Sequence, residues 1–158
     1  MTDQVQRAVV EAFYRAYDSR DIEQIAALLD DDVSWQIVGP KTIMQICGQW
    51  HGKAAVLNWF TSVVPAFVEF IRLDRDSLLV DGDRSALFGR IFSRHRESGR
   101  MICHQVAHFA RYRNGKLMSF CVINDSLDAA EQFAGRHIKV TGETRSHDVD
   151  MNADVVVV

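Results

Sequence analysis

Asn114 and Gly115 separate two segments, residues 101–113 and 116–124, in which apolar and polar residues alternate. An Asn-Gly pair between two such segments is the strongest short-range signal for a β-hairpin, because both residues tolerate the positive φ of a type I′ turn. A two-residue turn also fixes the register, because cross-strand partners must then have residue numbers that sum to 229. We therefore predict an antiparallel pair of strands with a defined set of facing residues.

The N-terminal half of the chain predicts helices. Apolar residues recur at helical spacing over residues 4–18, 22–29 and 53–67. Asp21 is a suitable N-cap for the second of these segments, with a glutamine three residues further on. We expect three helices, with a looser connection over residues 39–52 before the third.

Alternation predicts the strands of one sheet. Besides the hairpin, the alternating segments are residues 33–37, 68–74, 77–80 and 84–96, separated in part by turn sequences such as DGD and ESGR. A last short helix is expected over residues 127–133, with Asp125 or Ser126 as its cap. Helices followed by antiparallel strands predict an α+β domain over residues 1–140, and residues 141–158 are expected to form a tail or an arm.

The composition is that of an ordinary globular protein, with 47% hydrophobic and 25% charged residues. No apolar run approaches the roughly 18 residues of a membrane span, and the first residues lack the pattern of a signal peptide. We therefore expect a cytoplasmic protein with no membrane partner. The cysteines lack metal-ligand spacing, and neither a glycine-rich phosphate loop nor a basic-aromatic alternation is present, so we expect no metal, no cofactor and no nucleic-acid partner.

The predicted register brings three polar side chains together. The turn places His104 opposite Asp125, and a four-residue loop at ESGR places Ser93 on the other side of His104. Facing residues have Cβ atoms about 4.5–5.5 Å apart, and an imidazole paired with a carboxylate has a fixed tautomer that suits a general base. Alternatively, Asp125 only caps the last helix while His104 is a satisfied polar residue at the end of the sheet. A bulge in either strand would shift the register.

Three stretches of the chain carry a family resemblance: AFYRAYDSRDIEQIAALLDDDVSW, WHGKAAVLNWF and HFARYRNGKLMSFCVINDS. Over most of residues 5–134, the chain resembles SnoaL-like proteins of the nuclear-transport-factor-2-like superfamily, which includes ketosteroid isomerase. The resemblance implies a cystatin-like α+β cone, in which a curved, mostly antiparallel sheet wraps on three helices of the N-terminal half and a short C-terminal helix follows. It also implies a pocket inside the cone and a homodimer.

The catalytic residues of known members are not matched. In ketosteroid isomerase an aspartate base acts beside an oxyanion hole of a tyrosine and a protonated aspartate, and the resemblance places these residues on Ile37, Phe13 and Ala107. The acid that SnoaL-like cyclases and limonene-epoxide hydrolase carry on the last strand falls on Val122. All four residues are apolar, so those mechanisms are predicted to be absent. Asp125 matches an aspartate that many SnoaL-like members carry opposite a polar residue.

The resemblance also predicts which side chains face the pocket. They are Val33, Trp35, Ile37, Arg90, Phe92, Arg94, Cys103, Gln105, Ala107, Phe120, Val122 and Asn124 from the strands, with Phe13, Tyr17, Trp50 and His51 from elsewhere. Such a set suits a small hydrophobic or amphipathic ligand with an anionic or carbonyl group, although a packed core or a dimer face would have the same composition. By strict alternation His104 and Asp125 lie on the opposite face, unless a bulge near the strand ends re-aims them.

Two functions are consistent with these features. The first is a SnoaL-like enzyme for a cofactor-free isomerisation, cyclisation, lyase reaction or hydrolysis, with His104 as the base and Asp125 as its orienting partner. The second is a non-catalytic homodimer that binds a ligand or another protein. A cavity that His104 reaches would favour the first function.

Overall fold

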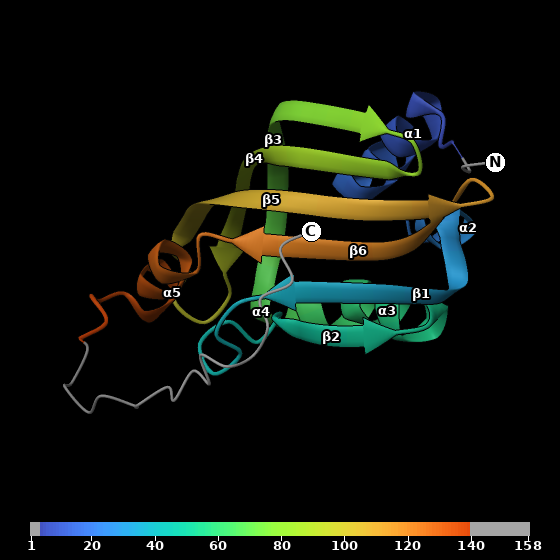
Figure 1. Ribbon diagram of the computed structural model, residues 1–158. Coiled ribbons are helices and arrows are strands. Elements are labelled where there is room, and N and C mark those ends of the chain that lie inside the picture. The colour runs from blue at the N-terminus through green and yellow to red at the C-terminus, as the bar shows by residue number, and fades with distance from the viewer. Residues whose placement is uncertain (1–3, 140–158) are drawn as a thin grey trace, which may run out of the picture.

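Six strands in the order β2-β1-β6-β5-β4-β3 form one curved sheet in the computed structural model, which describes residues 4–139 (Figure 1). The strands are β1 (Leu29–Val38), β2 (Gly48–His51), β3 (Val68–Asp81), β4 (Arg84–His95), β5 (Met101–Arg113) and β6 (Lys116–Asn124). β1 runs parallel to β6, whereas the other neighbouring strands are antiparallel. The tail predicted over residues 141–158 lies outside the described residues.

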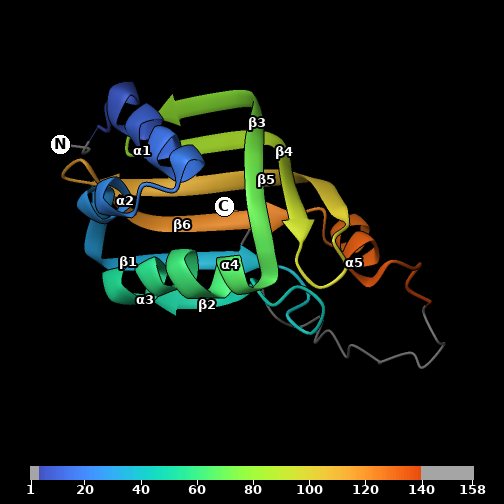
Figure 2. The same ribbon diagram turned by 180° about the vertical axis from the view of Figure 1, so that it is seen from behind.

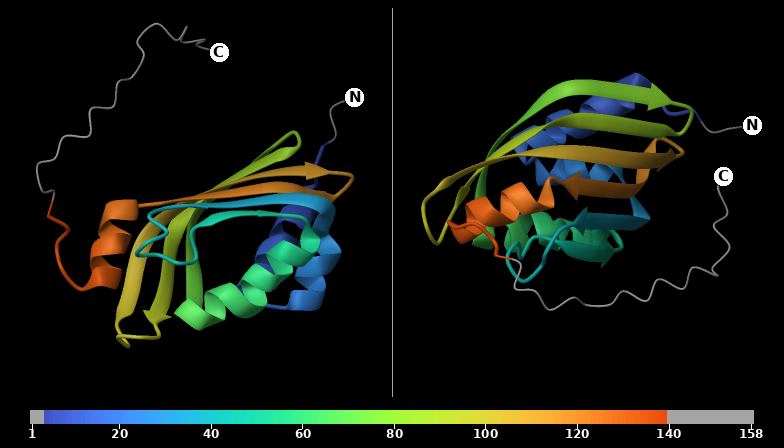
Figure 3. Two further views of the ribbon diagram at one scale, coloured as in Figure 1. Left: turned by 90° about the horizontal axis from the view of Figure 1, so that it is seen from below. Right: turned by 60° about the vertical axis from the view of Figure 1, so that its left-hand side comes forward.

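Helices cover one face of this sheet, and the strands curve around them (Figures 2 and 3). The helices are α1 (Arg7–Ser19), α2 (Ile22–Leu28), α3 (Lys53–Asn58), a π-helical turn (Trp59–Val63), α4 (Val64–Phe67) and, at one end of the sheet, α5 (Ser126–Ala134). As predicted, Asp21 caps α2 by accepting a hydrogen bond from the backbone N–H of Gln24 at 3.1 Å. The predicted α+β cone is confirmed.

Two strands differ from their predicted forms. β2 lies where the sequence predicts a connection, because its four residues are too few to show alternation. β3 is one continuous strand where two are predicted, because bulges after Phe70 and after Arg75 interrupt the alternation. Gly89 of β4 lies against the second bulge, where a Cβ atom would come within 2.3 Å of the Asp74 carbonyl oxygen. Only glycine therefore allows the two backbones to approach so closely.

Aromatic side chains fill the part of the cone between α1 and the centre of the sheet. Phe13, Trp35 and Phe120 are at most 1% exposed. The rings of Trp35 and Phe120 stack with centroids 4.2 Å apart, and Phe13 packs edge-on against Phe120 at 5.5 Å. The sequence predicts ligand contacts for all three residues, but the structure packs them against one another. This part of the cone is therefore a solid core.

A bulge at Met118 decides which residues of β5 face the helices. Next to the turn, Tyr112 pairs with Leu117 as predicted. Beyond the bulge Arg111 pairs with Ser119, and every later pair is shifted by one residue. Because side chains alternate between faces, a shift of one residue moves the whole of β5 to the other face relative to β6.

The shifted register places His104, Val106 and His108 on the inner face beside Val122 and Asn124. Residues that the sequence predicts for the pocket are turned to the outer face instead: Arg90, Phe92, Arg94, Cys103, Gln105 and Ala107. The loop between β4 and β5 is also longer than predicted, but this difference is an even number of residues and leaves the faces unchanged.

Candidate functional site

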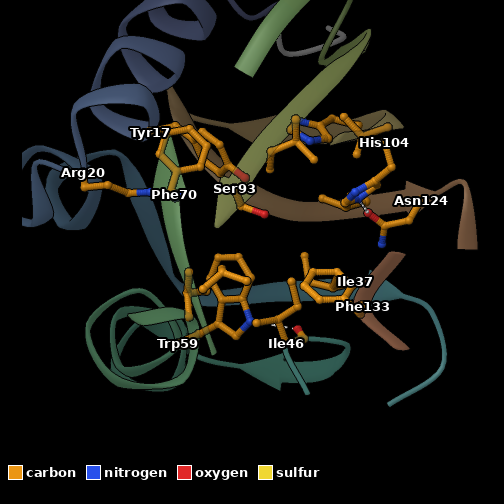
Figure 4. A pocket seen from close by; sticks show the side chains of 16 residues that line it. Tyr17, Arg20, Ile37, Ile46, Trp59, Phe70, Ser93, His104, Asn124 and Phe133 are labelled. Atoms are coloured by element: carbon orange, nitrogen blue, oxygen red, sulfur yellow. Dashed lines mark hydrogen bonds between the residues drawn. The ribbon is translucent and has the colours of Figure 1, made fainter. Parts of the chain in front are cut away.

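A cavity of about 40 Å³ lies between the end of α1, the π-helical turn and the inner face of the sheet (Figure 4). It is lined by Tyr17, Arg20, Ile37, Ile46, Trp59, Val64, Val68, Phe70, Ile91, Ser93, His104, Val106, His108, Val122, Asn124 and Phe133. One water needs about 10–15 Å³ of such volume, so the cavity has room for about three waters. A larger ligand must displace side chains.

His104 lies on this cavity as a buried imidazole whose tautomer is set by Asn124. The amide Nδ2 of Asn124 donates a hydrogen bond to the Val38 carbonyl oxygen at 2.7 Å, so its Oδ1 is the atom that faces His104. That oxygen lies 3.0 Å from Nε2 of His104 and can only accept, which places the proton on Nε2. Nδ1 of His104 is therefore a free lone pair, and it has no hydrogen-bond partner among the described residues.

The environment keeps His104 neutral. Burial lowers the pKa of His104 below its usual value, against the opposing effects of the Asn124 hydrogen bond and of the Asp128 and Asp125 charges. An unprotonated imidazole nitrogen on an apolar cavity can accept a proton from a bound molecule or from water. The site can thus perform general-base chemistry.

Asp125 does not pair with His104, and the predicted direct contact is wrong. The bulge moves Asp125 beyond the paired part of β6, where its backbone N–H donates to the Gln105 carbonyl oxygen at 3.0 Å. Its side chain is exposed and caps α5 by accepting from the backbone N–H of Asp128 at 3.4 Å. Asn124, one residue earlier, takes the place predicted for the aspartate. The alternative interpretation of Asp125, a helix cap, describes what it does.

His108 is a second imidazole on the cavity, and it is 1% exposed. Its Nδ1 lies 3.2 Å from the hydroxyl of Tyr14. The Tyr14 hydroxyl has no other acceptor among the described residues, so it donates to Nδ1 and leaves the proton of His108 on Nε2. Burial, followed by the charge of Arg20, lowers the pKa of His108 to about 3. His108 therefore presents a neutral N–H donor, which has no partner within residues 4–139.

The predicted ligand contacts divide into four groups. Tyr17, Ile37, Val122 and Asn124 line the cavity. Arg90 and Gln105 lie exposed on the outer face, and Phe13, Trp35 and Phe120 belong to the core. Trp50 is half-buried against Trp59, with ring centroids 5.9 Å apart, and His51 is exposed; neither lines the cavity.

Several residues on the cavity escape the sequence-based prediction. His108 and Val106 are missed because the bulge changes their face. Arg20, Trp59 and Phe70 are missed because the cavity lies at the meeting point of segments whose relative placement no local pattern reports. Within residues 4–139 no three His, Cys, Asp or Glu side chains are grouped to hold a metal ion, and no helix is long and apolar enough to cross a membrane.

The curved sheet, the helices within it and the enclosed cavity define a protein of the nuclear-transport-factor-2-like class. The model of the SnoaL-like domain family matches residues 10–120. The chain therefore belongs to the SnoaL-like domain family. No curated protein sequence matches the chain significantly.

Solved structures agree with this assignment. A protein from Rhodopseudomonas palustris described as a "Putative Isomerase" is 31% identical, with a TM-score of 0.69 over 80% of this chain and 93% of its own. TerC co-crystallised with polyporic acid is 24% identical, with a TM-score of 0.70 over 80% and 96% of the two chains. An LEH-like epoxide hydrolase from M. tuberculosis is 16% identical, with a TM-score of 0.65 over 81% and 88%. The last two similarities are of fold alone.

Proposed function

We propose that this SnoaL-like protein binds a small hydrophobic or amphipathic molecule and catalyses a proton transfer without a cofactor. Isomerisation, cyclisation, a lyase reaction and hydrolysis are the reactions this chemistry covers. The observation that carries the proposal is that His104 lines a largely apolar cavity with its tautomer fixed by Asn124 and its Nδ1 without a hydrogen-bond partner among the described residues. We propose that the protein acts in the cytoplasm, as its composition predicts.

In this proposal His104 takes the proton and His108 binds the oxygen on which negative charge develops. Asn124 holds the His104 ring in place, and the nearby carboxylates of Asp125 and Asp128 favour the imidazolium that forms. A neutral imidazole N–H can stabilise an oxyanion without first losing a proton to it. The Cα atoms of the two histidines are about 13 Å apart along β5, so the substrate must extend past Val106 to contact both.

Two relatives support the proposed type of reaction and of ligand. The Rhodopseudomonas palustris protein is described as a "Putative Isomerase", and TerC was co-crystallised with polyporic acid. Each fact concerns that relative, and the residues that would act in this chain are its own. Because Ile37, Phe13, Ala107 and Val122 are apolar, the proposed base is not the one that ketosteroid isomerase uses.

One observation favours a second function, a non-catalytic homodimeric module. The outer face of the sheet carries Phe88, Phe109 and Ile123, which are 44%, 50% and 47% exposed and lie on neighbouring strands. A contiguous apolar patch of this kind marks an interaction surface. We propose that a second copy of the chain covers it, in the enzyme as well as in the alternative.

Proton exchange into small carbonyl compounds tests the proposed function. The protein is incubated in D₂O with a panel of ketones and enones, and loss of the carbon-bound proton is followed by NMR. We expect exchange with at least one compound, slowed about 10²–10⁴-fold in a His104→Gln variant because the general base is lost. His137→Gln, at an exposed histidine bonded to Glu131, is the matched control and should exchange at the original rate.

The outcomes separate the two functions. An exchange rate that His104→Gln leaves unchanged would assign the chemistry to another group and overturn the proposal. Binding of these compounds without exchange would favour the non-catalytic module.

A further inference from the structure

Arg20 occupies an unusual place at the end of the cavity opposite His104 and Asn124 (Figure 4). It is the residue that follows α1, and its φ of 55° is in the left-handed region that favours glycine or asparagine. Its side chain runs into an aromatic cage. The guanidinium carbon lies 3.8 Å from the ring centroid of Phe70, 4.4 Å from that of Tyr17 and 5.2 Å from that of Phe60.

Arg20 forms no ion pair with a carboxylate among the described residues, although the charge of Asp18 and the hydroxyl of Tyr17 both favour its charged form. The nearby Asp18 directs its Oδ2 to Arg75 at 3.4 Å. No aspartate or glutamate lines the cavity. Nε and Nη1 of Arg20 are shielded from solvent and have no hydrogen-bond partner within residues 4–139. Aromatic faces offset part of the desolvation of a cation, but unmade N–H hydrogen bonds remain costly.

Arg20 also lies between the cavity and a depression on the surface. The depression has a volume of about 320 Å³, and it shares Arg20, Val64, Val68 and Phe70 with the lining of the cavity. If the side chains of Arg20 and Phe70 move, the two spaces join. The joined volume falls in the range of about 300–1,000 Å³ that small-molecule sites have. A molecule that enters from this depression therefore passes the guanidinium.

We propose that Arg20 is the anion-binding residue of this cavity, and that its ligands are small apolar molecules that carry one carboxylate. The carboxylate accepts hydrogen bonds from the free N–H groups of Arg20, while the apolar body extends between Phe70 and Trp59 toward the histidines. Charge-assisted bonds of this kind are the strong ones in a shielded site. The inference deepens the proposed function by naming its substrate class, and it rests on that function only for the reaction, not for the binding.

Two probes of the same shape test the charge requirement. Benzoate and benzamide differ in charge but hardly in size, and both are titrated while the side-chain N–H signals of arginine and histidine are followed by ¹⁵N NMR. We expect benzoate to shift the Arg20 Nε–H signal, assigned by its loss in Arg20→Lys, and to bind at least tenfold more tightly than benzamide. The proposal is overturned if benzoate does not bind more tightly than benzamide. It is also overturned if benzoate binds but does not shift the Arg20 Nε–H signal.

Two variants place the preference on one arginine. Arg20→Met keeps the length and apolar packing of the side chain but removes the charge, and we expect it to bind both probes equally. Arg90→Met removes an arginine exposed on the outer face and should keep the full preference. The opposite pattern overturns the proposal. If Arg20→Met fails to fold, the Nε–H shift in the unaltered protein still tests whether benzoate binds to Arg20.

The same probes distinguish a failure of this inference from a failure of the proposed function. In His104→Gln we expect the benzoate preference to survive while proton exchange is lost. Loss of exchange with an intact preference contradicts only the catalytic role. An intact exchange reaction with no preference contradicts only the role of Arg20.

Discussion

The interior of the cone has two parts that differ in how they are filled: a packed half around Phe13, Trp35 and Phe120, and an open half around Arg20 and His108. Around Phe13, Trp35 and Phe120 the rings pack against one another, and Nε1 of Trp35 is the one shielded polar atom of these three side chains without a partner among the described residues. Around Arg20 and His108 three shielded polar atoms have no partner within residues 4–139, and both side chains line the cavity. Buried polar groups are normally satisfied, so those that are not call for a ligand or water. The comparison indicates that the first half stabilises the fold, and the proposed function uses the second half.

The largest expected effect tests the packed half. Phe120→Ala removes a ring that is 1% exposed and stacked on Trp35, and we expect a loss of about 4 kcal/mol in the free energy of unfolding. Denaturant unfolding measures it. Leu127→Ala, which truncates a large apolar side chain 61% exposed on α5 and outside the proposed dimer surface, is the control and should cost less than about 1 kcal/mol. Equal losses would show that the packed half has no special role in stability.

The pH dependence of the free energy of unfolding tests the open half, and the expected effect is smaller. His108 has a pKa of about 3 in the folded protein, whereas an unfolded histidine titrates near 6.5. Below pH 6.5 the unfolded state binds the proton first, so stability is complete above that pH and falls as the pH falls. We expect a loss of about 2 kcal/mol between pH 6.5 and pH 5 from this group, and His104 acts in the same direction because its pKa is also lowered.

Unfolding in urea at the two pH values measures this dependence. His108→Gln keeps an acceptor for the Tyr14 hydroxyl but cannot titrate, so the loss should shrink in that variant. His137→Gln, at an exposed position, should leave the loss as it is. A dependence on pH that is the same in His108→Gln and in the unaltered protein would show that the open half buries no neutral imidazole there.

Local patterns predict the fold well and the site only in part. The helix over 4–18, the cap at Asp21 and the Asn114-Gly115 turn follow from spacing and turn chemistry, and the family resemblance gives the cone. The faces of β5 do not follow, because one extra residue at Met118 reverses them.

A signal for that bulge is present in the sequence. Leu117 and Phe120 are both large and apolar but stand three residues apart, which a strict period of two cannot place on one face. The structure buries both, with the bulge between them. No sequence signal of this kind predicts the position of the Arg20 side chain. That position depends on how the end of α1 contacts β3, and these two segments are distant in the chain.

Because of the bulge, Asn124 lies where an aspartate partner of His104 is predicted. A substitution at Asn124 can therefore create the predicted carboxylate–imidazole pair. In Asn124→Asp a carboxylate replaces the Oδ1 that accepts from Nε2 of His104, and we expect the pKa of His104 to rise by about one unit, or about 1.4 kcal/mol. The rise stays small because the carboxylate loses the hydrogen bond that Nδ2 makes to the Val38 carbonyl oxygen.

Histidine ¹⁵N NMR across a pH titration measures this pKa, and Asp125→Asn is the matched exchange in the opposite direction. Because Asp125 acts on His104 only through space, we expect that variant to lower the pKa by less than Asn124→Asp raises it. A larger effect at position 125 than at position 124 would mean that the register beyond Met118 is the one without the bulge. His104 would then face away from the cavity, and the open half of the cone would lose its base.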